Sequence, residues 1–129
     1  CALRVVDMAL AHLCVRQHFA LVLGVDPAQP GLGKGEPHFR IARETLGLTA
    51  SDLRVSIMTG DGAYDMQVAR AAGMTAVGRL TGANAEALFT AGAHAVVRNL
   101  RELEPIVDSL EDRSPAPGPA YYPSADTAP

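Results

Sequence analysis

Two aspartates spaced four residues apart, Asp61 and Asp65, form the pattern in this sequence that is best suited to chemistry. They follow an apolar segment that ends at Met58, and Gly60 and Gly62 stand in the loop with them. We expect the glycines to let the backbone turn sharply and to leave room for a ligand. Mg²⁺ prefers one or two carboxylates, several waters and phosphate oxygens. The loop therefore predicts a magnesium site at Asp61 and Asp65.

The same spacing also suits a purely structural role. An aspartate in the first turn of a helix, as Asp65 would be, is favoured by the positive end of the helix dipole. Asp61 would then be an ordinary turn residue. Spacing alone leaves both interpretations open.

A second candidate site is Lys34, which lies between two glycines and shortly before Pro37. A lysine next to a helix N-terminus can meet a phosphate, because backbone N–H groups and the helix dipole assist it. A solvated surface lysine is the alternative. The segment is no Walker A loop, since that motif needs glycine at Ala28 and serine or threonine at Gly35.

Hydrophobic periodicity and turn residues predict the elements that position these loops. We expect helices at 2–16, 37–46, 64–72, 85–91 and 99–110, and strands at 19–25, 53–58, 74–80 and 94–97. Apolar strands that alternate with helices indicate an α/β fold with a parallel sheet and right-handed crossovers. Ligands bind such sheets beyond the carboxyl ends of the strands, so the loops after residues 25, 59 and 80 are the places for a site.

Composition narrows the class of protein. The chain has 129 residues, enough for one domain, and its net charge of −3 with scattered basic residues predicts no nucleic-acid partner. No apolar run reaches the roughly 20 residues of a membrane span. The two cysteines, Cys1 and Cys14, form no framework and suggest a reducing compartment, so we expect a cytoplasmic protein. Residues 111–129, rich in Pro and Ala, predict a disordered tail.

The order of these features resembles the haloacid dehalogenase-like (HAD) hydrolases, especially their phosphoglycolate-phosphatase-like branch. The similarity spans about residues 3–110. Its landmarks occur in the family's order: His18-Phe19-Ala20-Leu21-Val22-Leu23-Gly24, Gly33-Lys34-Gly35-Glu36-Pro37, Thr45-Leu46-Gly47, Gly60-Asp61-Gly62-Ala63-Tyr64-Asp65, Ala71-Ala72-Gly73-Met74, Thr81-Gly82, Ala91-Gly92-Ala93 and Leu100-Arg101-Glu102-Leu103.

The resemblance implies a Rossmann-like core and a Mg²⁺-dependent phosphatase that acts on a small phosphorylated metabolite through an aspartyl-phosphate. It implies that Lys34 neutralises the phosphoryl group and the nucleophile, that Asp61 ligates Mg²⁺, and that Asp65 supports the metal. Gly35 departs from the family's usual proline. Gly60 before Asp61 favours a phosphatase over the family's mutases, which tend to carry glutamate there.

The family's nucleophilic Asp-x-Asp motif occurs nowhere in the sequence, and neither Asp7 nor Asp26 replaces it. We therefore expect residues 1–110 to be the C-terminal part of a HAD-like core whose first two strands are absent. Such a chain would be inactive alone, and its open sheet edges would favour self-association. The alternative from another class is a catalytically dead α/β module that binds a partner.

Overall fold

The computed structural model describes residues 2–25, 31, 35–82 and 84–111. Helices and strands follow in the order α1 (Leu3–His12), η1 (Arg16–His18), α2 (Glu36–Leu46), α3 (Ala50–Arg54), β1 (Ile57–Gly60), α4 (Ala63–Ala71), β2 (Thr75–Arg79), α5 (Ala85–Thr90), β3 (Ala95–Val97), η2 (Leu100–Leu103) and α6 (Glu104–Glu111). The expected tail lies almost wholly outside the described residues.

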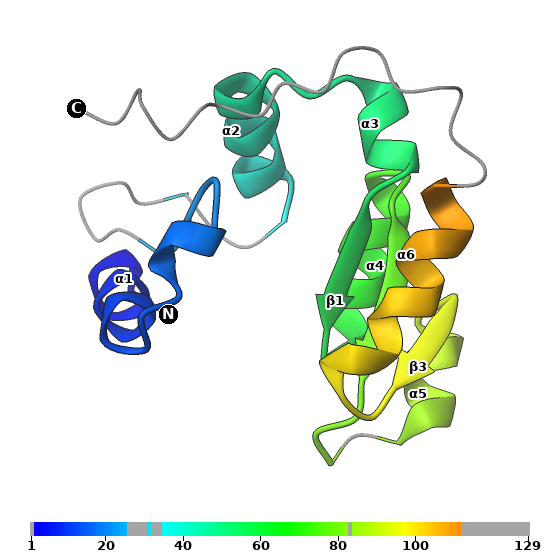
Figure 1. Cartoon of the computed structure of the whole chain (residues 1–129). Coiled ribbons are helices and arrows are strands. Elements are labelled where there is room, and N and C mark those ends of the chain that lie inside the picture. Colours follow the sequence, from blue (N-terminus) through cyan, green and yellow to red (C-terminus); the bar gives the residue numbers. More distant parts are fainter. Residues whose placement is uncertain (1, 26–30, 32–34, 83, 112–129) are drawn as a thin grey trace.

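The three strands form one parallel sheet in the order β1-β2-β3, which confirms the predicted α/β class. Register pairs Gly60 of β1 with Gly78 of β2, and Gly78 with Val96 of β3, so the carboxyl ends of neighbouring strands lie side by side. Helices α4 and α5 lie behind the sheet in Figure 1, and α6 passes in front of it. The arrangement is a layered, Rossmann-like partial core.

The core lies between the sheet and helices α4 and α5. Met66 and Ala69 of α4 pack with Ala76 of β2 and Leu88 of α5, and all four side chains are almost completely buried. Full burial of a side chain such as Met or Leu stabilises the fold by about 1.5–3 kcal/mol. At Gly78, a Cβ atom would lie 2.9 Å from Cδ1 of Leu88, so the glycine lets α5 pack closely on β2.

Capping residues set where the helices around the site begin and end. Helix α2 ends at Gly47, whose φ of 66° is left-handed, the conformation that glycine adopts without strain. Thr49 then caps α3: its hydroxyl accepts from the Asp52 N–H at 3.2 Å, and the Asp52 carboxylate accepts from the Thr49 N–H at 2.6 Å. Hydrogen bonds from the Thr49 side chain and backbone lower the pKa of Asp52 below its ordinary value.

Two predicted element boundaries and one predicted strand were wrong. The strand expected at 53–58 begins only at Ile57, because the capping box at Thr49 starts α3, which runs to Arg54. The helix expected at 2–16 ends at His12, and Cys14 beyond it takes a left-handed φ of 56°. Residues 19–25 form no strand: Val25 makes one isolated parallel bridge to Ala2.

The N-terminal segment lies to one side of the sheet in Figure 1. Helix α1 buries none of its residues, and the exposed fractions of Val5 and Met8 are 59% and 65%. An apolar helix face in water indicates that this segment contributes little packing energy to the described fold.

The outer edge of β1 has no neighbouring strand among the residues that the structure describes. Ser56 O accepts from the Thr75 N–H at 2.9 Å, so the parallel ladder turns the polar backbone groups of Met58 and Gly60 towards β2. Those of Ile57 and Thr59 consequently point to the other edge, where no strand in the described part of the chain pairs with them. β1 also carries no charged residue that would discourage pairing with another strand.

Candidate functional site

Asp61 is the first residue after β1 and its side chain is exposed. The Thr81 hydroxyl, two residues beyond the end of β2, donates a hydrogen bond to Asp61 Oδ2 at 3.0 Å. Two loops at the carboxyl edge of the sheet therefore meet at the Asp61 carboxylate. This is the edge at which open α/β sheets bind ligands.

Asp65 lies in the first turn of α4 and is almost completely buried, with an exposed fraction of 2%. Its Oδ2 accepts from the Gly62 N–H at 3.1 Å, and its own N–H donates to Gly62 O at 3.1 Å. A carboxylate at this position satisfies a donor of the helix start and benefits from the helix dipole. The structural role considered from the sequence is therefore present. The metal-supporting role stays a prediction.

Gly60 is required for space rather than for backbone conformation. Neither Gly60 nor Gly62 has a positive φ. A Cβ atom at Gly60 would lie 2.5 Å from Oδ2 of Asp65, and closer still to its Cβ and Cγ atoms. At Gly62 the same construction leaves an ordinary 3.5 Å to Oδ2. Gly60 thus allows the Asp65 carboxyl to pack against the end of β1.

Lys34 lies outside the described residues. Its neighbour Gly35 is buried at the N-terminus of α2, and a Cβ atom there would lie 3.0 Å from the Tyr64 hydroxyl and 3.5 Å from Cγ2 of Val68. Gly35 has a φ of 115°, which proline cannot adopt. The departure from the family's usual proline therefore matches the backbone at this position. It brings the start of α2 against α4, the helix that carries Asp65.

The donor set fits Mg²⁺ better than a metal that needs an all-protein cage. In the part of the chain that the structure describes, no group of three or more His, Cys, Asp and Glu side chains gathers. Two carboxylates, Asp61 and Asp65, are what Mg²⁺ requires when waters and substrate oxygens complete its octahedron. One of them is held rigidly by burial and the other is open to solvent.

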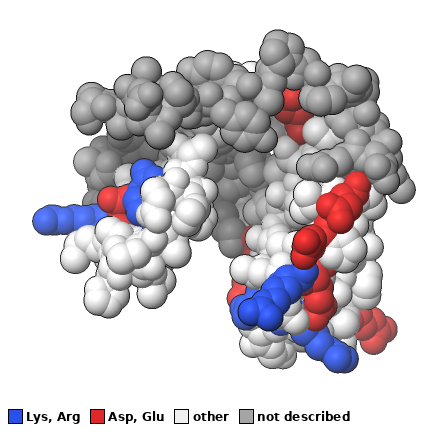
Figure 2. Space-filling view, in the orientation of Figure 1, with Lys and Arg blue, Asp and Glu red and all other residues white. Residues whose placement is uncertain are grey.

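Charged side chains of both signs occur on the face of the molecule that Figure 2 shows. On the face in Figure 2, acidic and basic side chains are interspersed over the C-terminal elements and form no patch of one sign. No helix among the described residues is both long and apolar enough to cross a bilayer.

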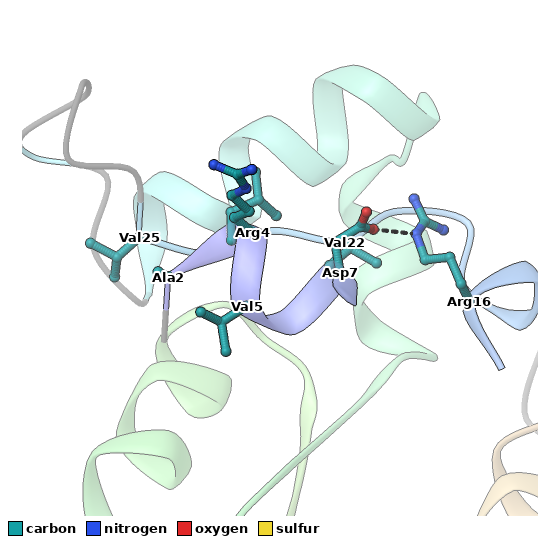
Figure 3. A pocket seen from close by; sticks show the side chains of 8 residues that line it. Ala2, Arg4, Val5, Asp7, Arg16, Val22 and Val25 are labelled. Carbon is teal, nitrogen blue, oxygen red and sulfur yellow. Dashed lines mark hydrogen bonds and ion pairs between the residues drawn. The ribbon is translucent and has the colours of Figure 1, made fainter. Parts of the chain in front are cut away.

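A separate hollow of about 710 Å³ lies between α1 and the extended segment that contains Val22 and Val25. Figure 3 shows Asp7 on its wall in an ion pair with Arg16, at 2.7 Å from Oδ1 to Nε. Asp7 therefore lies on α1 in a surface ion pair, not at the carboxyl edge of the sheet.

Sequence reasoning missed two side chains that organise the sheet ends. Thr81 stood out in the sequence only as part of a landmark of the family resemblance, yet its hydroxyl donates a hydrogen bond to Asp61. His94, a residue with no metal-ligand spacing, accepts the Ala76 N–H at Nδ1, at 3.0 Å, where β3 begins beside β2. The His94 contact joins residues 18 positions apart and the Thr81 contact joins residues 20 positions apart, so no local sequence pattern predicts either of them.

A family model identifies the family of this chain. The model of the HAD-hydrolase-like family matches residues 32–103, more than half of the chain. The crystal structure of a hydrolase from Pseudomonas syringae superposes with a TM-score of 0.57 at 26% sequence identity. That match covers 81% of this chain and 49% of that chain, so this chain spans about half of its length. No curated protein matches.

Proposed function

Because this chain belongs to the HAD-hydrolase-like family, we propose that it is part of a hydrolase that cleaves phosphomonoesters of small metabolites with the help of Mg²⁺. The observation that carries the proposal is the pair of carboxylates at the carboxyl edge of the sheet. Asp61 is exposed there, and Asp65 is fixed beside the end of β1. A hydrolase that matches at 26% identity supports the reaction class.

We assign a separate role in binding Mg²⁺ or phosphate to each candidate site residue. Asp61 and Asp65 would hold Mg²⁺, which supplies positive charge for the phosphoryl oxygens. Lys34 would add a fixed positive charge where negative charge develops during transfer. The backbone amide of Gly62 would keep Asp65 in place through its 3.1 Å hydrogen bond. Burial keeps the Asp65 carboxyl from rotating away.

The nucleophile would come from polypeptide outside residues 1–129. Phosphoryl transfer through an aspartyl-phosphate needs a nucleophilic aspartate, which the family carries in an Asp-x-Asp motif. The sequence of this chain has no such motif. Residues 1–110 would then be the C-terminal part of a core domain that another stretch completes. On this proposal the 129-residue chain binds Mg²⁺ and phosphate but does not turn substrate over. Mg²⁺-dependent turnover by the chain that survives Asp61→Asn would contradict it.

Metal binding can be tested on the chain itself by thermal melting. A ligand that binds only the folded state stabilises it by RT ln(1 + [L]/Kd), about 1.4 kcal/mol at ten times Kd. MgCl₂ should therefore raise the melting temperature of the wild type. Asp61→Asn should abolish most of the increase, because the amide is a weak Mg²⁺ ligand. Equal increases in both proteins would show that Asp61 holds no metal.

A second candidate function is that of a binding module without chemistry, in the cytoplasm as the composition suggests. The specific observation in its favour is the outer edge of β1, where no strand among the described residues pairs with the backbone of Ile57 and Thr59. A strand from a second copy or another protein would satisfy them. Association of the chain in solution without any Mg²⁺-induced stabilisation would favour this function over the hydrolase.

A further inference from the structure

We propose that Thr81 is a positioning residue: its hydroxyl fixes the Asp61 carboxylate in the orientation that receives Mg²⁺. The inference rests on the proposed function and extends it to a residue of a different loop. Its observation is the 3.0 Å hydrogen bond from Thr81 Oγ1 to Asp61 Oδ2, which joins residues 20 positions apart.

The donor is held by the sheet rather than by a free loop. Register places Gly60, immediately before Asp61, beside Gly78 of β2. Leu80, immediately before Thr81, donates its N–H to Val97 O of β3 at 2.9 Å. Both partners of the bond therefore follow residues that are tied into the β ladder. The hydroxyl and the carboxylate start from backbone positions that the sheet fixes relative to each other.

Asp61 needs such a partner more than Asp65 does. Burial and the Gly62 N–H orient Asp65, whereas Asp61 is exposed and would otherwise sample several rotamers. Among the described residues, the Thr81 hydroxyl is the partner that holds the Asp61 side chain. A carboxylate offers about four lone-pair sites, so one hydroxyl donor leaves the rest available to a cation.

A hydroxyl donor that orients a carboxylate ligand acts on metal affinity through another residue. Removal of such outer partners commonly weakens metal binding about 10- to 100-fold. Thr81 is exposed, so we expect an effect near the lower limit of that range, about 10-fold. A threonine that merely anchors its loop would change the stability of the chain and leave the intrinsic affinity of Asp61 unchanged.

The test is a Mg²⁺ titration of the 129-residue chain, followed by the amide signals of Gly60 and Gly62 in ¹H–¹⁵N NMR spectra. Thr81→Val keeps the side-chain shape and removes the donor, and should raise the Kd for Mg²⁺ about 10-fold. Thr81→Ser restores the donor and should bind close to the wild-type Kd. Thr90→Val is the matched control, because Thr90 is an exposed threonine of α5.

The outcomes separate this inference from the proposed function. Asp61→Asn should abolish the Mg²⁺-dependent shifts; if it binds as the wild type does, the proposed metal site is wrong. If Asp61→Asn loses binding while Thr81→Val keeps the wild-type Kd, the inference alone fails. It also fails if Thr81→Ser binds as weakly as Thr81→Val, since the hydroxyl would then not be the cause. Melting temperatures of all variants verify that each is folded.

Discussion

Replacing Gly60 with alanine should displace the Asp65 carboxyl and destabilise the fold around the candidate site. The new methyl carbon would overlap the carboxyl of Asp65, at 2.5 Å from Oδ2 in the present geometry. Asp65 cannot retreat easily, because its exposed fraction is only 2% and its Oδ2 is bonded to the Gly62 N–H. Either the start of α4 moves away from β1, or the carboxyl rotates and loses its cap.

The expected loss of stability follows from these two routes. Forcing an extra methyl group into a packed interior costs about 1–3 kcal/mol. Losing the cap at the start of α4 costs about 1 kcal/mol. We therefore expect Gly60→Ala to lower the free energy of unfolding by about 2 kcal/mol, measured by urea denaturation. In a domain of this size that corresponds to a decrease of roughly 7–9 °C in melting temperature.

Gly62→Ala is the matched control, in the same loop. Its φ is −120°, and its Cβ atom would lie at an ordinary 3.5 Å from Oδ2 of Asp65. Alanine there should cost less than about 1 kcal/mol, the loss of a favourable N-cap glycine. If Gly60→Ala unfolds at the same urea concentration as Gly62→Ala, the close packing of Gly60 against Asp65 does not make glycine necessary at position 60 for stability.

Three further predictions concern charge and the open sheet edge. Asp65→Asn should change stability by less than about 1 kcal/mol without Mg²⁺, because an amide oxygen can still accept the cap hydrogen bond, but MgCl₂ should no longer raise its melting temperature. Thr49→Ala should raise the pKa of Asp52 towards its ordinary value, as read from carboxyl ¹³C shifts. The amides of Ile57 and Thr59 should exchange with solvent faster in dilute samples than in concentrated ones, if copies of the chain associate through β1.

The sign of the pH effect at Asp52 follows from its lowered pKa. A carboxyl whose folded pKa lies below its ordinary value of 3.8 stabilises the fold above that pH. The contribution is lost as the pH falls through the folded pKa. Thr49→Ala should therefore lose less stability than the wild type on acidification below pH 3.8. An unchanged Asp52 pKa in the variant would refute the role of the Thr49 hydrogen bonds.

Hydrogen exchange at β1 has an internal control. Met58 turns its amide towards β2, so its exchange should be slow at every protein concentration. Equal behaviour of Met58 and Thr59 would contradict the deduced direction of the ladder. Exchange at Ile57 that does not depend on concentration would contradict self-association through this edge.

The parallel sheet and the loop of Asp61 and Asp65 could be predicted from the sequence, because both depend on local features such as apolar runs, turn glycines and helix caps. Gly47 ends α2 and Asn84 caps α5, and both residue types are favoured at these positions. The parallel strands then bring their carboxyl ends together. The order of elements was therefore accessible without the structure.

The predicted bounds of an element were wrong where two local sequence signals favoured different structures. An apolar run from Leu53 to Met58 indicated a strand, but Thr49 and Asp52 have the spacing of a capping box and begin a helix there. Residues 19–25 are apolar enough for a strand, yet a strand also requires a neighbour, and the structure describes none for them except a bridge at Val25. Pairing is a non-local property that periodicity does not reveal.

The candidate site was predicted in part for the same reason. Asp61 and Asp65 are close in sequence, so their common loop was visible. The bond from Thr81 to Asp61 depends on strand register across 20 residues. The need for glycine at position 60 depends on how α4 packs against β1. Contacts of this kind become visible only in three dimensions.

Phosphate release by the protein made from the complete reading frame that contains this chain would test the proposed phosphatase directly. With para-nitrophenyl phosphate as substrate, we expect hydrolysis that requires Mg²⁺, stops with EDTA and is lost in Asp61→Asn. Hydrolysis that continues in Asp61→Asn at the wild-type rate would contradict the assignment of the metal site. No hydrolysis of any phosphomonoester by the wild type would contradict the phosphatase.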